Sequence, residues 1–254
     1  MQVLKPQMYN PEIAQWKSFL KAIGRYEFPI DECYDPTLEV AVKAYQRQKN
    51  TVDDGYIGNA TWFAAYRDGM PFSEPQRRAF PLKPAFAPLK SQQERFATFG
   101  LIKFKATPLA GNPENITMVN DFEARNIVTV QVPQLQALFP HLQHIRFHRK
   151  GVSQLLDFFQ AIERQGLLTK VMSFGGSYVP RLVRGSTTVL SNHAFGTAFD
   201  LNVAWNPWQE QPALLGALGS VREIVPLAHA HGFYWGGHFT KPDGMHFELV
   251  RLLE

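Results

Sequence analysis

The chain has one cysteine, Cys33, so it can form no internal disulfide and no cysteine-rich zinc site. It also lacks any apolar run approaching the roughly 18 residues of a transmembrane helix, and we expect no membrane span. Residues 1–7 lack the apolar segment of a classical signal peptide. If the protein acts outside the cell, its delivery by another export path or by lysis stays open.

Several hydrolase signatures are absent as well. No Gly-x-Ser-x-Gly nucleophile elbow occurs, which argues against a serine hydrolase. A zinc deaminase needs a pair of cysteines, and a single cysteine excludes that pattern. Cys33 has no evident partner base in the sequence, which argues against a thiol nucleophile.

The charge is modest and uneven. Residues 1–70 carry 8 Lys/Arg and 9 Asp/Glu, whereas the rest of the chain carries 18 Lys/Arg and 13 Asp/Glu. A mildly basic body suits a polyanionic surface, but solubility explains it equally well. Charge alone therefore assigns no partner, and we expect no nucleic-acid partner.

The first 70 residues predict a mini-domain of three short helices. Asp35-Pro36 is typical of a helix start, with Asp as the N-cap and Pro in the first turn. Asn59 is placed to cap a third helix that carries Trp62, Phe63 and Tyr66. The first helix is indicated by apolar residues at helical spacing before a glycine, which are Ile13, Trp16, Leu20, Ile23 and Gly24.

Residues 71–90 are rich in proline and predict an extended linker, with an ordered strap on one domain as the alternative. A second domain then spans 91–254. Its patterns predict helices at 152–162 and 221–228 and short strands at 127–132, 170–174, 199–203 and 246–250. Helices mixed with strands, without regular alternation, favour an α+β fold with a small antiparallel sheet.

The strongest chemical signal is a pair of motifs in this second domain. Ser191-Asn192-His193 leads through Gly196 and Ala198 to Asp200, and Asp243-Gly244-Met245-His246 follows 43 residues later. His193, Asp200 and His246 offer two imidazoles and one carboxylate, which are suitable zinc ligands. Three protein ligands leave one coordination position for water, so we expect a catalytic Zn²⁺ site.

Asp243 remains as a carboxylate outside this ligand set. It lies in Pro242-Asp243-Gly244, which is typical of a turn because Pro presets φ and Gly supplies a positive φ. A turn three residues before a ligand would hold the carboxylate near the metal without ligating it. We therefore expect Asp243 to be the general acid/base that moves the proton of the attacking water.

These motifs resemble a known family of zinc D-alanyl-D-alanine carboxypeptidases and L-alanyl-D-glutamate endopeptidases, which cut peptidoglycan stem peptides. The resemblance implies that His193, Asp200 and His246 hold the zinc and that Asp243 is the catalytic acid/base. It extends to residues 176–186, where the family has an arginine that contacts the substrate. Arg181 is the first candidate for this role and Arg184 the second. Related endopeptidases often have Asp after Trp-Gly-Gly, where this chain has His238, which we expect to be a loop histidine.

The first domain is similar to the three-helix peptidoglycan-binding domain. The similarity lies in residues 37–46, in Asp54-Gly55-Tyr56-Ile57-Gly58 and in Thr61-Trp62. It implies peptidoglycan as a partner and action at the bacterial cell wall, as in an endolysin. The alternative is a spacer or a dimerisation unit.

The sequence thus predicts a zinc metallopeptidase that hydrolyses peptidoglycan stem peptides, with L-Ala–D-Glu endopeptidase as the first hypothesis. A D-Ala-D-Ala carboxypeptidase is the alternative within the enzyme class. A wall-binding protein on an inactive peptidase scaffold is the alternative outside it. The oligomeric state and a phage or bacterial origin stay open.

Overall fold

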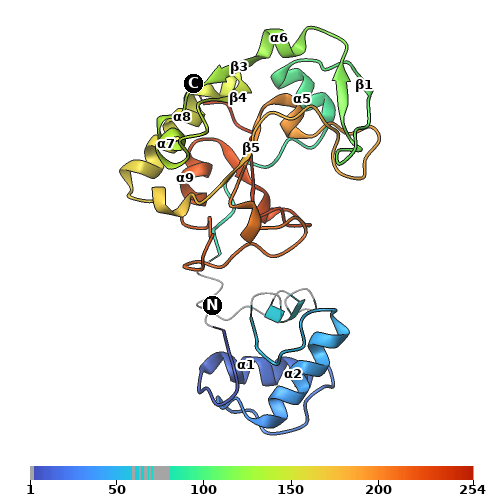
Figure 1. Ribbon diagram of the computed structural model, residues 1–254, viewed down its shortest axis with the longest axis vertical. Coiled ribbons are helices and arrows are strands. Elements are labelled where there is room, and N and C mark those ends of the chain that lie inside the picture. Colours follow the sequence, from blue (N-terminus) through green and yellow to red (C-terminus); the bar gives the residue numbers. More distant parts are fainter. Residues whose placement is uncertain are drawn as a thin grey trace. The chain divides into compact units, whose positions relative to one another are not determined.

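The computed structural model describes residues 3–58, 61–62, 64–65, 68, 70 and 80–253. The chain divides into two compact units, Met1–Phe80 and Pro81–Glu254 (Figure 1). Residues 71–79, which form half of the predicted linker, lie outside the described residues. Residues 81–90 belong to the second unit, where Phe86 contacts the rings of His229 and Tyr234.

The N-terminal unit contains two described helices, α1 (Pro11–Ala22) and α2 (Pro36–Gln48). The side chain of Asn10 accepts from the backbone N–H of Glu12, and that of Asp35 accepts from Leu38, so each helix begins at a capped proline turn. Residues 61–62 and 64–65 are helical too. The predicted cap Asn59, with Phe63 and Tyr66, lies outside the described residues.

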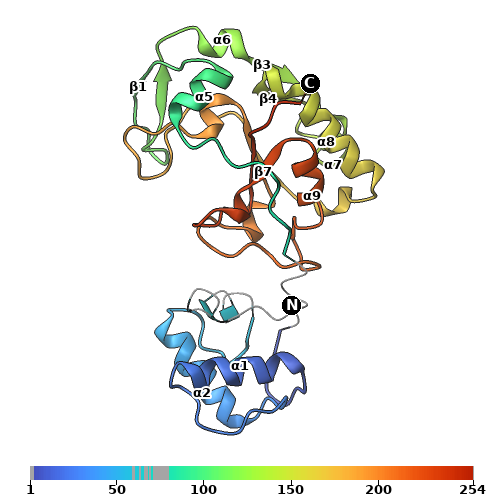
Figure 2. The same cartoon turned by 180° about the vertical axis from the view of Figure 1, so that it is seen from behind.

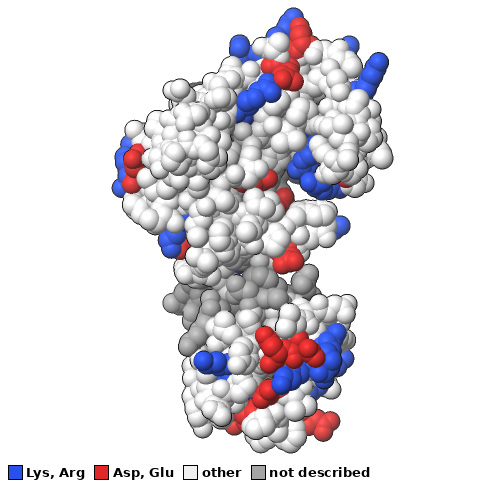
Figure 3. Space-filling view, viewed as in Figure 1, with Lys and Arg blue, Asp and Glu red and all other residues white. Residues whose placement is uncertain are grey.

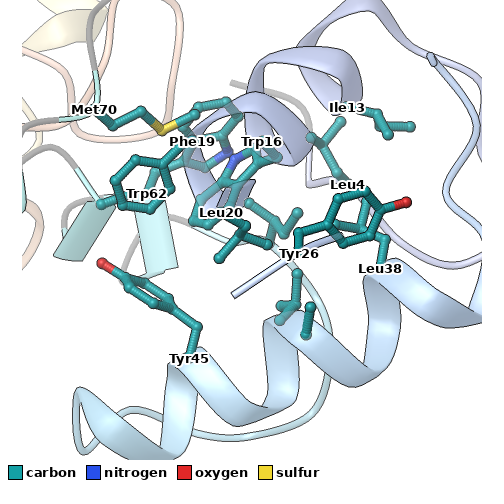
Figure 4. Packing of buried hydrophobic residues seen from close by; sticks show 14 of the residues in the cluster. Leu4, Ile13, Trp16, Phe19, Leu20, Tyr26, Leu38, Tyr45, Trp62 and Met70 are labelled. Atoms are coloured by element: carbon teal, nitrogen blue, oxygen red, sulfur yellow. The ribbon is translucent and has the colours of Figure 1, made fainter. Parts of the chain in front are cut away.

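An aromatic core joins the elements of this unit (Figure 4). The rings of Trp16 and Trp62 meet edge to face with centroids 5.2 Å apart, and Tyr45 from α2 lies 6.0 Å from Trp16. Leu4 pairs with Ile57 in a short backbone bridge, which fastens the start of the chain to the segment after α2. The core thus joins residues from α1, α2 and the segment that follows.

Charged side chains of both signs are intermixed on one face of the N-terminal unit (Figure 3). Lys43 pairs with Glu39 at 2.7 Å along α2, and Arg47 pairs with Asp53 at 3.1 Å. Solvent-exposed pairs of this kind contribute at most about 1 kcal/mol each. This face therefore supplies solubility more than stability.

The C-terminal unit is α+β, as predicted. Its sheets are β1–β2, β3–β4 and a four-stranded antiparallel sheet in the order β5-β6-β8-β7. The strands are β1 (Phe104–Ala106), β2 (Ile116–Met118), β3 (Ile127–Val130), β4 (Ile145–His148), β5 (Phe174–Gly176), β6 (Ala198–Leu201), β7 (Phe233–Trp235) and β8 (His246–Leu249). The helices are α5 (Gln92–Phe99), α6 (Phe122–Asn126), α7 (Pro133–Leu138), α8 (Val152–Arg164) and α9 (Val225–Ala230). Every helix in the described residues is too short or too polar to cross a bilayer.

Two local predictions in this unit are wrong. Residues 170–174 were expected to form a strand, but β5 begins only at Phe174. The side chain of Asn202 explains the difference, because its Oδ1 accepts from the backbone N–H groups of Met172 and Ser173. The helix expected at 221–228 begins at Val225, where Pro226 occupies the first turn.

The four-stranded sheet has one aromatic face and one polar face. Phe199 of β6 stacks on Phe247 of β8 with ring planes 8° apart, and Phe158 of α8 contacts both rings. Because side chains alternate along a strand, Asp200 and His246 project from the opposite face. Helix α8 therefore covers the aromatic face of the sheet (Figure 1, Figure 2) and leaves the polar face for the site.

Candidate metal centre

His193 lies in a 3₁₀ turn, Asn192–Phe195, between Ser191 and β6. The Ser191 side chain accepts from the backbone N–H of His193 and caps this turn. Gly196 then adopts φ +66°, and its carbonyl accepts from the N–H of His148 in β4. A Cβ at Gly196 would lie 2.6 Å from Ile127, so only glycine lets the chain turn against β4 and enter β6.

The tautomer of His193 follows from its partner. Nδ1 lies 2.6 Å from the backbone carbonyl of Ser177, and a carbonyl can only accept, so Nδ1 carries a proton. In the neutral ring, Nε2 then has a lone pair. This atom is buried and makes no hydrogen bond within the described part of the chain, although it lies 3.3 Å from Oδ1 of Asp200.

Asp200 and His246 are brought together by strand register. They are directly opposed in the β6–β8 pair, and Oδ1 of Asp200 lies 3.2 Å from Nδ1 of His246. The other ring nitrogen of His246, Nε2, lies 3.2 Å from Oε2 of Glu248. Glu248 thus accepts the proton on Nε2 and leaves Nδ1 facing Asp200.

The three predicted ligands therefore converge. One donor atom from each of His193, Asp200 and His246 lies within 4.8 Å of the other two. Nε2 of His193 and Nδ1 of His246 both lie close to Oδ1 of Asp200, so a positive charge between these atoms, either a proton on His246 or a metal ion, would hold them together. Buried nitrogen and oxygen donors in this arrangement fit a divalent metal ion.

The electrostatics of the cluster also favour a cation. Burial by itself would raise the pKa of Asp200, but the adjacent imidazoles of His193 and His246 hold it well below its usual range. Burial would lower the pKa of His246, but the carboxylates of Asp200 and Glu248 raise it. Negative charge on both sides of His246 stabilises positive charge at this place.

Glu248 lies two residues after His246 on β8, so that both side chains project from the same face of the sheet. Its Oε2 accepts a hydrogen bond from the side chain of Asn192, next to His193. This carboxylate is almost fully buried. One carboxylate thus connects the two segments that carry the histidines, and it fixes the orientation of the His246 ring.

Asp243 lies outside the ligand cluster, and it lines a cavity together with Asp200 and His246. Its Oδ1 is buried without a hydrogen bond to any residue that the structure describes. Burial raises the pKa of Asp243, and the charge of Asp200 adds to this, while His246, His193 and Arg181 act in the opposite direction. A carboxylate with an unbonded oxygen at a cavity wall is able to exchange a proton with a substrate or with water.

The turn that carries Asp243 differs in detail from the prediction. It runs from Asp243 to His246 and is closed by the backbone N–H of His246 on the carbonyl of Asp243, at 3.1 Å. Gly244 is not at positive φ; a Cβ there would lie 2.6 Å from Pro212. Glycine is therefore needed for space rather than for a special backbone conformation.

A second glycine makes room for Asp243. The carbonyl of Gly236 accepts from the backbone N–H of Asp243 at 3.0 Å. A Cβ at Gly236 would lie 2.5 Å from the Asp243 carbonyl oxygen and 3.1 Å from the Cβ of His246. The Trp235-Gly236-Gly237 segment thus packs directly against the backbone of the site.

The cavity lined by Asp200, Asp243 and His246 measures about 560 Å³, and both arginine candidates also line it. Arg181 is half-buried, and its Nη1 donates to the carbonyl of Leu182 at 3.1 Å. Burial and Arg184 lower the pKa of Arg181, whereas Asp200 and Asp243 act against this, which places its charge near the site carboxylates. Arg184 is exposed, and its Nη1 lies 3.4 Å from Oε2 of Glu114.

His238 does not line this cavity among the described residues. It is buried in an aromatic cluster, where its ring stacks on His229 at 5.3 Å and meets the ring of Trp235 edge on. Burial lowers the pKa of His238 to about 4, with the charge of Lys83 and the nearby His229 contributing. His238 thus lies in the 3₁₀ turn that follows β7 and packs against aromatic side chains rather than facing the cavity.

Some cavity residues carry no sequence signal. Arg95 of α5 and Trp208 line the cavity, yet neither belongs to the motifs. Trp208 reaches it through a backbone bridge to Asp243. Asn192, whose side chain donates to Glu248, lies inside the first motif. Its position beside His193 was the one feature of the sequence that pointed to this residue.

Comparison with known proteins adds two family matches. Residues 184–249 match the family described as D-alanyl-D-alanine carboxypeptidase, and residues 9–64 match the putative peptidoglycan binding domain. Both resemblances are confirmed. The first match contains the three candidate ligands and Asp243, and it indicates a metallopeptidase. The second indicates peptidoglycan as a partner. No curated protein matches the chain.

Proposed function

We propose that the protein is a zinc-dependent peptidase that hydrolyses peptidoglycan stem peptides at the cell wall, with the L-Ala–D-Glu bond as its target. The observation that carries this proposal is the convergence of His193, Asp200 and His246 beside the unpartnered carboxylate of Asp243. The two family matches supply the substrate class. Export and release by lysis both remain compatible with this site of action.

Zinc is the metal that best fits the donor set. Two imidazole nitrogens and one carboxylate oxygen are typical of catalytic zinc sites, which keep a fourth position open. Calcium and magnesium prefer sets made of oxygen alone. When bound, zinc supplies Lewis acidity and lowers the pKa of a coordinated water to about 7.

The protein's own groups would then do the following. Asp243 takes the proton of the attacking water and returns it to the leaving amine, which its buried Oδ1 is free to do. Arg181 positions the substrate, because a planar guanidinium binds a carboxylate in a bidentate manner. Arg184 is the weaker candidate, since Glu114 already pairs with it.

The choice of bond separates two candidates. The short Asp-x-x-His-Phe-Glu motif and the attached binding domain favour the endopeptidase. The family description favours a D-alanyl-D-alanine carboxypeptidase. An inactive wall-binding scaffold is disfavoured, because such a scaffold has no need to keep a carboxylate oxygen of Asp243 buried without a hydrogen bond to any described residue.

Digestion of purified sacculi tests all three. The zinc-loaded protein is incubated with sacculi, and the released fragments are identified by mass spectrometry with and without a chelator. New N-terminal D-Glu, lost with chelator and restored by zinc, supports the endopeptidase, whereas loss of terminal D-Ala supports the carboxypeptidase. Binding to sacculi without chelator-sensitive cleavage would mean that the enzyme proposal is wrong.

A further inference from the structure

Arg95 reaches the cavity from α5, outside both matched segments. The helix begins with a capping box, in which the side chains of Ser91 and Glu94 each accept a backbone N–H of the other residue. Gln92 accepts from the N–H of Leu190 at 2.9 Å, and Phe96 packs on Phe195 with ring centroids 5.9 Å apart. Helix α5 therefore lies against the segment that carries His193 (Figure 1, Figure 2).

The guanidinium of Arg95 lacks a hydrogen-bonding partner among the described residues. Its Nε is buried without a hydrogen bond to any of them. Burial lowers the pKa of Arg95 while the carboxylates of Glu248 and Glu94 act against this, and a guanidinium stays charged at neutral pH. Arg95 is thus a half-buried cation at the cavity wall.

The neighbouring acidic groups are already engaged. Glu248 lines the cavity with Arg95, but its Oε2 is bonded to Asn192 and His246. Glu94 is held by the backbone N–H groups of Lys90 and Ser91. Both carboxylates are therefore bonded elsewhere, and an anionic ligand entering the cavity would give the half-buried guanidinium the charge-assisted hydrogen bonds that it lacks.

We propose that Arg95 binds a carboxylate of the substrate and is a specificity-determining residue for peptides that carry a free carboxylate beside the scissile bond. This inference rests on the proposed function. In an L-Ala–D-Glu substrate the group in question is the free carboxylate of the D-Glu residue. Arg95 then selects the acidic form of the peptide over its amide, which offers the guanidinium no negative charge.

The test compares two stem peptides that differ only in this carboxylate, free in one and amidated in the other. Binding is measured by calorimetry in the zinc-loaded Asp243→Asn protein, in which turnover is blocked, and kcat/KM is measured in the wild type. We expect the free acid to bind about 10- to 100-fold more tightly. Arg95→Gln should reduce this ratio to near one, and Arg95→Lys should keep part of it.

Arg125→Gln is the matched control, because this arginine is three-quarters exposed on α6 and bonded to Asp121. It should leave the ratio unchanged. Metal content and thermal unfolding of each variant report whether the fold is intact. If Arg95→Gln weakens both peptides equally, or changes neither, the inference is wrong. Absence of cleavage by the wild type would contradict the proposed function, while the binding ratio still decides the role of Arg95.

Discussion

Lys17 in the N-terminal unit and Asp243 in the C-terminal unit are both ionisable side chains with buried polar atoms, but their surroundings differ. The Lys17 side chain is fully buried, and its Nζ donates to Asp31 at 2.8 Å and also to Asp35. Burial by itself would lower the pKa of Lys17, but the two carboxylates raise it. Asp243 is half-buried, and its Oδ1 makes no hydrogen bond with any other described residue.

The difference in hydrogen bonding distinguishes a charged group that stabilises the fold from one that is available for chemistry. A buried ion pair whose members are all bonded mainly stabilises one arrangement of the chain, here the attachment of α1 to the segment before α2. A carboxylate oxygen that is buried without a hydrogen bond contributes little to stability, and such groups are candidates for a functional role. Changes at the two clusters should therefore affect different properties.

The largest expected effect is at a proposed metal ligand. His193→Ala removes one of three donors, and we expect the protein to lose stoichiometric zinc after dialysis and to lose measurable activity. Glu248→Gln is the comparison, since an outer partner of a ligand typically changes metal affinity about 10- to 100-fold. Zinc titration against a competing chelator measures both. Full zinc binding by the His193 variant would exclude it as a ligand.

Asp243→Asn should leave metal binding near stoichiometric and still lower kcat about 10²- to 10⁴-fold, the range for loss of a general acid/base. Because the wild-type oxygen has no partner, the variant should unfold at the same temperature or slightly higher. Zinc content, steady-state kinetics and thermal unfolding on one preparation check the three expectations. A variant with unchanged kcat would remove Asp243 from the mechanism.

How much of this site the sequence predicted depends on the residue. His193, Asp200, His246 and Asp243 were found because a metal site needs particular donors, and short motifs carry them. The distances between these side chains were not predictable, because the 3.2 Å contact of Asp200 with His246 depends on the register of β6 against β8. Arg95 could not be found, since helix packing alone brings it to the cavity.

The same contrast holds for the fold. The caps of α1 and α2 were local, so Asp35-Pro36 sufficed to locate the start of α2. The segment 170–174 looked like a strand because it is apolar, but the Asn202 side chain takes the backbone N–H groups that a strand would use. A tertiary contact from a residue 30 positions away decided the outcome there.

Gly236→Ala tests the site without touching a charge. The added Cβ would meet the carbonyl oxygen of Asp243 at 2.5 Å, so the Asp243 backbone must shift. A displacement of about 1 Å near a reacting group can lower the rate roughly 100-fold. We expect kcat to fall about 10- to 100-fold with zinc retained. Gly58→Ala is the control, because nothing lies within 4 Å of its added Cβ.

Lys17→Met addresses the other half of the comparison. The variant keeps the apolar stem but removes the charge, which leaves Asp31 and Asp35 without their shared partner. Asp31 is more than half exposed and can be rehydrated, so we expect a loss of about 1–3 kcal/mol in the free energy of unfolding of the N-terminal unit. This loss is measured by unfolding the protein in urea and monitoring hydrogen exchange of the backbone amides in α1 and α2. Peptidase kinetics on a soluble peptide should not change.

The smallest expected effect is the response of this ion cluster to acid. Burial by itself would raise the pKa of Asp35, but Lys17, Thr37 and the Leu38 N–H lower it to about 2. Because the folded pKa lies below the unfolded one, the contribution of Asp35 is complete above about pH 4 and is lost as the pH falls through 2. It amounts to about 1–2 kcal/mol, reduced by partial exposure of the carboxylate. In Lys17→Met, the stability of α1 and α2 should vary less over this pH interval than in the wild type; equal slopes would show that the pairing of Asp35 with Lys17 does not contribute to stability.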